Sequence, residues 1–307
     1  MILKKLLGDK RIKHTPVLLK ESIDHLLTDR NGVYVDCTFG RGGHSREILK
    51  RISDTAKLYS FDLDPDALSA SKEIQSKNFN FIHDNFRNLD NYFDNESISG
   101  AIIDCGLSSP QLDSPERGFS FQKKGPLDMR FNNQSGATCS DIVNEYKEEE
   151  ISHILWAYGE EEESRRIAKA IVARRSAKIF NDTLDLSNLI KNTKRIKTKK
   201  HAATKSFQAF RMAVNDEMLN LEQCLETLKK KISKGGKIIV ISFHSLEDRL
   251  VKNAFKKKIN LHEKQIPIIE EEKNPLFKTH KLIYPSEDEV KINIRSRSAK
   301  MRVIEKL

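Results

Sequence analysis

The stretch VYVDCTFGRGGHSREILKRI at 33–52 decides the fold. VYVDC is a short β-rich run, FGRGG interrupts it, and apolar residues then recur at helical spacing. A strand, a glycine turn and a helix in this order form the first half of a β-α-β unit. The next stretch, KLYSFDLDPDALSASKEI at 57–74, repeats the pattern, with Pro65 in the first turn of its helix. We therefore expect a parallel sheet with helices between its strands.

Three more short apolar runs extend this sheet: FNFIH (79–83), GAIIDCG (100–106) and KIIVISF (237–243). Strands that are apolar on both faces are typical of a sheet covered by helices on both sides. From about 108 to 200 helical spacing dominates and no strand stands out, and one long helix is expected from Thr204 onward. The sequence thus predicts an α/β fold, a Rossmann-like doubly wound sheet with an inserted all-helical domain.

The polar residues that carry chemistry follow the strands, where ligands bind in such a sheet. Gly40, Gly42 and Gly43 come after the first strand. Asp62 ends the second strand, at the usual place for an acid that accepts hydrogen bonds from ribose hydroxyls. Asp104 ends the fourth strand. These residues predict a nucleoside-binding site at one edge of the sheet.

The glycine loop does not follow the dinucleotide-binding pattern. G-x-G-x-x-G would need glycine at the position of Ser45, and no G-K-[ST] follows the glycines, which argues against a P-loop. An acid ahead of the glycines, D-x-x-x-G-x-G from Asp36, resembles S-adenosylmethionine-dependent methyltransferases more than dehydrogenases. Phe86, after the third strand, is positioned to stack on a purine.

Charge indicates the kind of partner. Among 307 residues, 54 Lys and Arg outnumber 44 Asp and Glu, and basic runs lie at 191–200, 252–258 and 295–302. Separated basic runs favour a polyanion, although charge alone does not distinguish RNA from DNA. Four scattered cysteines without C-x-x-C spacing indicate reduced thiols, as in a cytoplasm, and we expect neither a membrane span nor a metal site.

Long stretches resemble the bacterial small-subunit ribosomal RNA methyltransferase H family, from about His14 to about Arg302. They are HTPVLLKESIDHL (14–26), DCTFGRGGHS (36–45), SSPQLDSPERGFSFQKKGPLDMRF (108–131), YGEEEESRRIAKAIV (158–172), TKSFQAFRMAVNDE (204–217) and ISFHSLEDRLVK (241–252). The resemblance implies a class I methyltransferase core and methyl transfer from S-adenosylmethionine to the exocyclic N4 of a cytidine in the decoding region of small-subunit ribosomal RNA.

The resemblance also implies site residues and domains. Cofactor contacts fall on Gly42, Gly43, His44, Asp62, Phe86, Asp104 and Gln111. Asp104 is further expected to orient the target amine, together with carbonyl groups of the loop after the fourth strand or the hydroxyl of Ser109. Residues 1–110 and 204–307 would form the core, and 111–203 the inserted helical domain that recognises RNA. The substrate would be the free RNA or the assembled small subunit.

Two alternatives to N4 methylation remain. Cytosine C5 methylation needs a thiolate, for which Cys105 is the only plausible residue. A non-catalytic assembly factor could keep the same nucleoside pocket without turnover. Of two further residues, His244 is expected to be a hydrogen-bonded histidine at a strand end, and Trp156 to lie in the core of the insertion.

Overall fold

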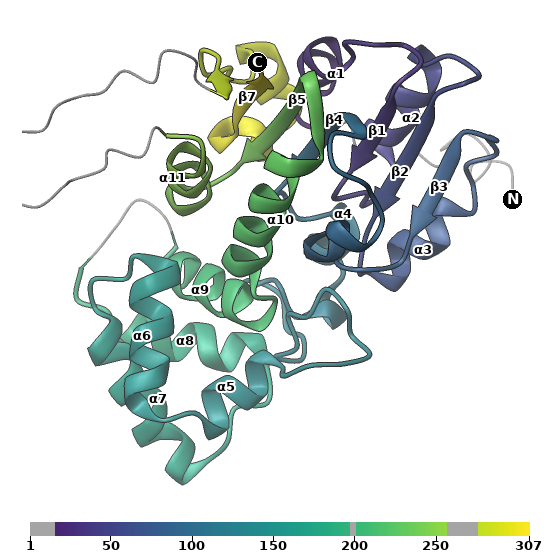
Figure 1. Ribbon diagram of the computed structural model, residues 1–307. Coiled ribbons are helices and arrows are strands. Elements are labelled where there is room, and N and C mark those ends of the chain that lie inside the picture. Colours follow the sequence, from purple (N-terminus) through teal and green to yellow (C-terminus); the bar gives the residue numbers. More distant parts are fainter. Residues whose placement is uncertain (1–15, 197–200, 257–275) are drawn as a thin grey trace, which may run out of the picture.

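The computed structural model describes residues 16–196, 201–256 and 276–307; the side chains of residues 109 and 110 are outside this description. Two parts are visible in Figure 1, a twisted sheet with helices on both sides and a group of helices at one end of it. Within the described residues no helix is long and apolar enough to cross a membrane.

The sheet has seven strands in the order β3-β2-β1-β4-β5-β7-β6. β7 is antiparallel to both of its neighbours, whereas β1 to β5 pair in parallel. The strands are β1 (Val33–Asp36), β2 (Lys57–Phe61), β3 (Phe79–Ile82), β4 (Ile98–Asp104), β5 (Ile232–Ser242), β6 (Phe277–Thr279) and β7 (Lys300–Lys306). This order with one reversed strand is the class I methyltransferase topology, so the predicted fold class is confirmed.

Helices cover both faces of the sheet because its strands are apolar on both sides. On one face Tyr34 and Ile239 pack with α1 (Leu19–Leu26) and α2 (Gly43–Arg51). On the other, Val35 packs with α10 (Glu217–Lys231) and α11 (Ser245–Ala254). The shorter helices beside the sheet are α3 (Pro65–Ser71), η2 (Phe86–Asn91), α12 (Glu287–Ile292) and η4 (Ile294–Ser298).

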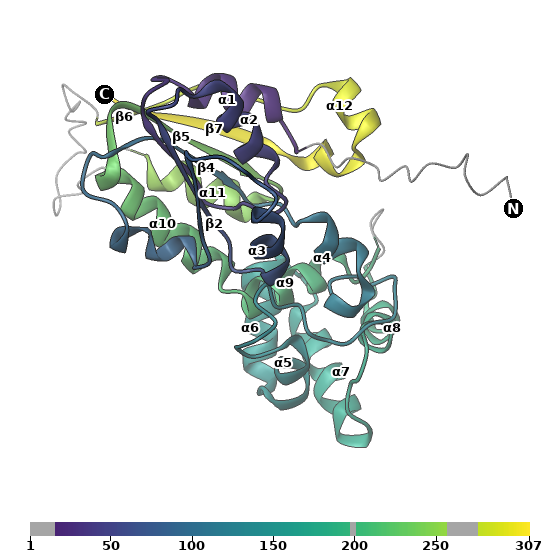
Figure 2. The same ribbon diagram turned by 90° about the vertical axis from the view of Figure 1, so that its right-hand side faces the viewer.

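Among the described residues between β4 and α10 there are helices and no strand, with an irregular stretch at 118–138. The helices are α4 (Ser109–Asp113), η3 (Pro115–Arg117), α5 (Cys139–Glu145), α6 (Glu148–Gly159), α7 (Ser164–Ala177), α8 (Thr183–Thr193) and α9 (Thr204–Val214). They enclose a hydrophobic cluster of their own that runs from Phe119 to Phe210. Figure 2 shows α5 to α8 projecting away from the sheet. This cluster includes Phe207 and Phe210 of α9, which lies beyond the predicted boundary at 203/204. The division of the chain at 110/111 and 203/204 stays a prediction.

The single long helix expected from Thr204 is wrong. The chain breaks it into α9 and α10 at Asp216, whose φ of 49° is left-handed. A second difference lies beyond it: β5 begins at Ile232, earlier than the strand expected at 237–243. Gly235 has φ 77° where the pairing of β4 and β5 is irregular, so it serves the strand and not the helix end.

Candidate functional site

The loop between β1 and α2 is held in shape by Asp36. This buried carboxylate accepts hydrogen bonds from the Ser45 hydroxyl (2.6 Å) and from the backbone N–H of Thr38 (3.2 Å). Ser45 is also 2.8 Å from the Ser60 hydroxyl in β2. Asp36, the acid ahead of the glycines, therefore orders the loop and connects it through Ser45 to β2.

Glycine is required at the predicted positions Gly42 and Gly43 by conformation and by close packing. Gly42 has φ 74°, and a Cβ there would lie 2.6 Å from the ring of Phe39. At Gly43 a Cβ would lie 2.0 Å from Cγ of Pro16. Gly40 also has a left-handed φ, 55°, but the space beside it is open. The loop thus combines a tight turn with exposed backbone at Gly40, where a ligand can approach.

Asp62 stands at the end of β2, half-buried beside this loop. Its carboxylate accepts hydrogen bonds from the N–H groups of Gly40 (2.7 Å) and Asp64 (2.9 Å). Burial raises the pKa of Asp62 to about 6, an effect that these two N–H groups partly offset. Each carboxylate oxygen has a second lone pair, so both retain capacity to accept a hydroxyl.

Asp104 and His44 lie next to each other at the ends of neighbouring elements. Asp104 Oδ1 accepts the N–H of Gly106 (2.9 Å), and its Oδ2 is 4.0 Å from His44 Nδ1. The Asp104 side chain keeps 19% of its surface exposed. Burial lowers the pKa of His44, which is therefore neutral at pH 7, and its buried Nε2 has no hydrogen-bond partner within the described residues.

Gln111 and Phe86 occupy different environments. Gln111 is buried in α4, where its Oε1 accepts the N–H of Ser108 (3.0 Å) and its Nε2 donates to Asp64 Oδ2 (2.9 Å). Phe86 begins η2 after β3 and packs, partly buried, against the cluster that contains Phe61. Gln111 is thus joined to the loop that carries Asp62, whereas Phe86 lies one strand farther out.

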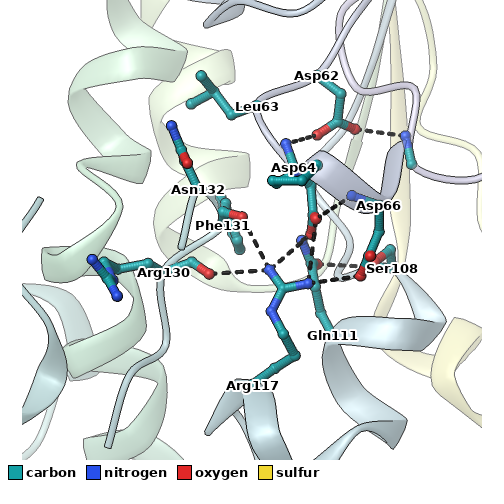
Figure 3. A network of polar contacts seen from close by, with 12 residues as sticks. Asp62, Leu63, Asp64, Asp66, Ser108, Gln111, Arg117, Arg130, Phe131 and Asn132 are labelled. Carbon is teal, nitrogen blue, oxygen red and sulfur yellow. Dashed lines mark hydrogen bonds and ion pairs between the residues drawn. The ribbon is translucent and has the colours of Figure 1, made fainter. Parts of the chain in front are cut away.

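A buried ion pair that the sequence did not reveal joins these segments (Figure 3). Arg117 donates to both carboxylate oxygens of Asp64, Nη2 at 2.9 Å and Nη1 at 3.3 Å, and both side chains are buried. Asp64 also caps α3 by accepting the N–H of Asp66. The D-P pair at 64–65 is a helix-start signal, but nothing in the pattern of ERGFSF indicates a buried guanidinium.

The structure also describes His244 and Trp156, for each of which an environment was expected from the sequence. His244 caps α11: its Nδ1 accepts the N–H of Glu247 (3.4 Å), as expected of a hydrogen-bonded histidine at a strand end, whereas its Nε2 lies 2.8 Å from Glu247 Oε1 without hydrogen-bond geometry. The placement of Trp156 in the core of the insertion is wrong, because 64% of it is exposed on α6. Helical spacing alone did not tell which side of α6 faces the cluster.

In the basic run 191–200, Lys191 and Arg195 are exposed, whereas Lys194 is engaged within the insertion. Lys194 Nζ is buried and donates to both oxygens of Glu161 (2.8 and 3.0 Å). The N–H groups of Arg195 and Ile196 donate to Glu163. Residues 197–200 and 257–258, which hold the other lysines at the ends of the first two basic runs, lie outside the described residues. In the third run, Arg295 and Arg297 are exposed on η4.

Metal ligation has no support in the described ranges, where no group of three or more His, Cys, Asp or Glu side chains could hold an ion. The thiol of Cys105, next to Asp104, has a pKa raised well above its ordinary value, chiefly by burial and further by Glu247 and Asp104. A thiolate is therefore disfavoured at this position.

The family model and the named relatives agree on one family. The family model described as the MraW methylase family matches residues 11–307. "Ribosomal RNA small subunit methyltransferase H" of Idiomarina loihiensis is 44% identical over 304 residues, 95% of this chain and 96% of that protein. The protein of the same name from Legionella pneumophila (strain Paris) is 44% identical, over 96% of this chain and 99% of that protein. A crystal structure of a putative rRNA-methylase from Clostridium thermocellum matches with TM-score 0.46 and 12% identity, over 96% of this chain and 100% of that one.

Proposed function

The chain belongs to the MraW methylase family, and from that membership we propose that it transfers a methyl group from S-adenosylmethionine to the exocyclic N4 of a cytidine in the decoding region of small-subunit ribosomal RNA. Relatives with full-length similarity carry the name of a small-subunit ribosomal RNA methyltransferase. The observation that carries the proposal is the convergence of the glycine loop, Asp62 and Asp104 at the carboxyl ends of the parallel strands β1, β2 and β4.

The residues at this edge fit S-adenosylmethionine. Asp62 would accept the ribose hydroxyls, and the open backbone at Gly40 would lie along the ligand. The unpartnered, buried Nε2 of His44 offers a polar contact, and Phe86 an aromatic one. When bound, the cofactor supplies an activated methyl group. The chain's own contribution is to place the acceptor in line with that group, since proximity and orientation dominate such a transfer.

Asp104 is the residue we propose for the target amine. The lone pair of a cytosine amine is delocalised into the ring, and acceptors that hold its N–H groups favour its attack on a methyl carbon. Asp104 is partly exposed and stands between the glycine loop and the segment 106–108. The Ser109 hydroxyl, also expected to take part, lies outside the described side chains. After transfer the amine releases one proton, which Asp104 is placed to accept.

The two alternatives are less well supported. C5 methylation would need Cys105 as a thiolate, and its raised pKa works against that form. A non-catalytic assembly factor would need no set of acids at the strand ends, whereas Asp62 lies beside the glycine loop and Asp104 is partly exposed. Digestion of RNA after incubation with cofactor separates the three, giving N4-methylcytidine, 5-methylcytidine or no modified nucleoside.

We further propose that η4 and the insertion contact RNA and that the protein acts in the cytoplasm. Arg295 Nη2 donates to Asp113 Oδ1 (2.7 Å) at the end of α4, which brings η4 beside the helix that carries Gln111. Arg297 is exposed on the same turn and is free to reach phosphates. The insertion would form the other side of the RNA surface. Small-subunit RNA, free or assembled, and a cytoplasmic location follow from this function.

A further inference from the structure

Arg117 joins the insertion to the segment that follows β2. Arg117 is 8% exposed, and its guanidinium donates to Asp64 through both terminal nitrogens. Nη1 also reaches Asp66 Oδ2 at 3.0 Å. Since Asp64 begins α3, this fork of contacts fixes the start of that helix from the side of the insertion (Figure 3).

The same guanidinium holds a second segment of the insertion. Nη2 donates to the backbone oxygens of Arg130 (3.2 Å) and Phe131 (3.0 Å). Gln111 of α4 donates to Asp64 Oδ2, the same oxygen that accepts from Arg117 Nη2. One buried carboxylate and one buried guanidinium therefore connect the start of α3 with Gln111 and with the backbone at 130–131.

The connection ends at the acid proposed to bind the cofactor. The N–H of Asp64 donates to Asp62 Oδ1, and the N–H of Gly40 donates to Asp62 Oδ2. Asp64 thus joins Arg117 to Asp62, while Asp62 keeps its own hydrogen bond to the glycine loop at Gly40. Arg117 does not contact Asp62 itself and acts on it only through Asp64.

We propose that Arg117 is a positioning residue, which sets the orientation of the RNA-facing insertion relative to the cofactor site by holding Asp64, Gln111 and the backbone at 130–131 together. The inference rests on the proposed function and adds a residue to it. A tie of this kind matters most to the rate at saturating substrates, because a displacement of about 1 Å between reacting groups costs on the order of 100-fold in rate.

Arg117→Lys tests this most directly. Lysine keeps a positive charge beside Asp64, but it lacks the planar fork that reaches both Asp64 oxygens and two carbonyl groups at once. We expect kcat with saturating S-adenosylmethionine and small-subunit ribosomal RNA to fall by at least about 10-fold, within the range that misplacement produces. Affinity for S-adenosylhomocysteine should change little, because Asp62 and the glycine loop retain their own hydrogen bonds.

A matched pair of variants separates positioning from loss of stability. Arg117→Gln and Lys194→Gln each neutralise one partner of a buried ion pair, but the Lys194–Glu161 pair lies wholly within the insertion. Both should lower the melting temperature, and rates are compared at a temperature where each variant is folded, per site that binds S-adenosylhomocysteine. We expect only Arg117→Gln to lower kcat.

The outcomes are distinct. Wild-type kcat in Arg117→Lys, or an equal fall of kcat in Lys194→Gln, would overturn the positioning role while wild-type turnover leaves the proposed function intact. A wild-type protein without any methyl transfer would overturn the proposed function, and the positioning role with it. Reduced kcat in both Arg117 variants with normal turnover in Lys194→Gln is the result that the inference requires.

Discussion

Asp62 is the residue whose titration should be visible in ligand binding. Its pKa is raised to about 6, chiefly by burial, from an ordinary value of 3.8. Ribose hydroxyls donate to the ionised form, so affinity for S-adenosylhomocysteine should fall as the pH decreases through about 6 and level off above it. Calorimetry across this range measures the effect. In Asp62→Asn the affinity should be weaker at pH 8 and the step near pH 6 absent; an unchanged step would assign it to another group.

The raised pKa of Asp62 affects folding stability in the direction opposite to its effect on ligand binding. Folded Asp62 binds its proton more tightly than the unfolded chain does, so its contribution to the free energy of unfolding is fully present below pH 3.8 and declines as the pH rises toward about 6. Bound cofactor would offset this decline, because it stabilises the ionised carboxylate.

Asp104→Asn examines the proposed catalytic role. If the carboxylate holds the target amine, kcat should fall sharply at saturating cofactor while affinity for S-adenosylhomocysteine changes modestly. Steady-state rates over a range of cofactor concentrations distinguish this from a role in cofactor binding alone, in which saturating cofactor restores the rate. Restoration would end the catalytic assignment of Asp104.

At the scale of elements, the glycine turn before α2 depends on close packing with Pro16. Gly43→Ala would place Cβ 2.0 Å from Pro16 Cγ, so the variant should be destabilised by about 1–3 kcal/mol, the usual cost of overpacking. Chemical denaturation measures the change in the free energy of unfolding. Pro16→Ala combined with Gly43→Ala makes room for the new methyl group and should recover part of it. If the changes in the free energy of unfolding of the two single variants simply add up in the double variant, packing against Pro16 is not the cause of the destabilisation.

Elements with strong local signals were the ones predicted from sequence. β1 to β4 and the strand at 237–243 were recognised because each is a short apolar run next to a helix-start or glycine signal. The break at Asp216 was missed, because a left-handed aspartate leaves the apolar period nearly unchanged on either side. Exposure of Trp156 was missed for a related reason: α6 is apolar over much of its surface, and only tertiary packing decides which side is covered.

In the site, too, residues with a local sequence signal were proposed, whereas residues defined by tertiary contacts were not. Gly42, Asp62 and Asp104 follow strands and could be proposed from position alone, and they do meet at one edge of the sheet. Whether they bind cofactor stays a prediction. Arg117 and Asp64 were not proposed, because a buried ion pair between residues 53 positions apart has no signature in either local sequence.

For the whole molecule, the proposed RNA surface at η4 predicts a change in salt dependence. Arg295→Gln combined with Arg297→Gln should weaken RNA binding, because fewer counterions leave the RNA when the protein binds. The slope of log affinity against log salt should decrease by about 0.7–0.9 for each phosphate that is no longer neutralised. Filter binding over a range of salt concentrations measures the slope.

A matched control lies at the opposite edge of the sheet. Arg30 and Lys57 are exposed near the starts of β1 and β2, away from the strand ends that carry the site. Arg30→Gln with Lys57→Gln removes the same charge and should leave the slope unchanged. Equal slopes in the two double variants would show that net charge, and not a surface at η4, governs binding.

The most direct test of the account is the identity of the modified nucleoside. Purified protein is incubated with S-adenosylmethionine carrying a labelled methyl group, in parallel with protein-free small-subunit RNA and with assembled small subunits, and the RNA is digested to nucleosides. The account predicts labelled N4-methylcytidine from at least one substrate. Labelled 5-methylcytidine, or no labelled nucleoside from either substrate, would contradict it.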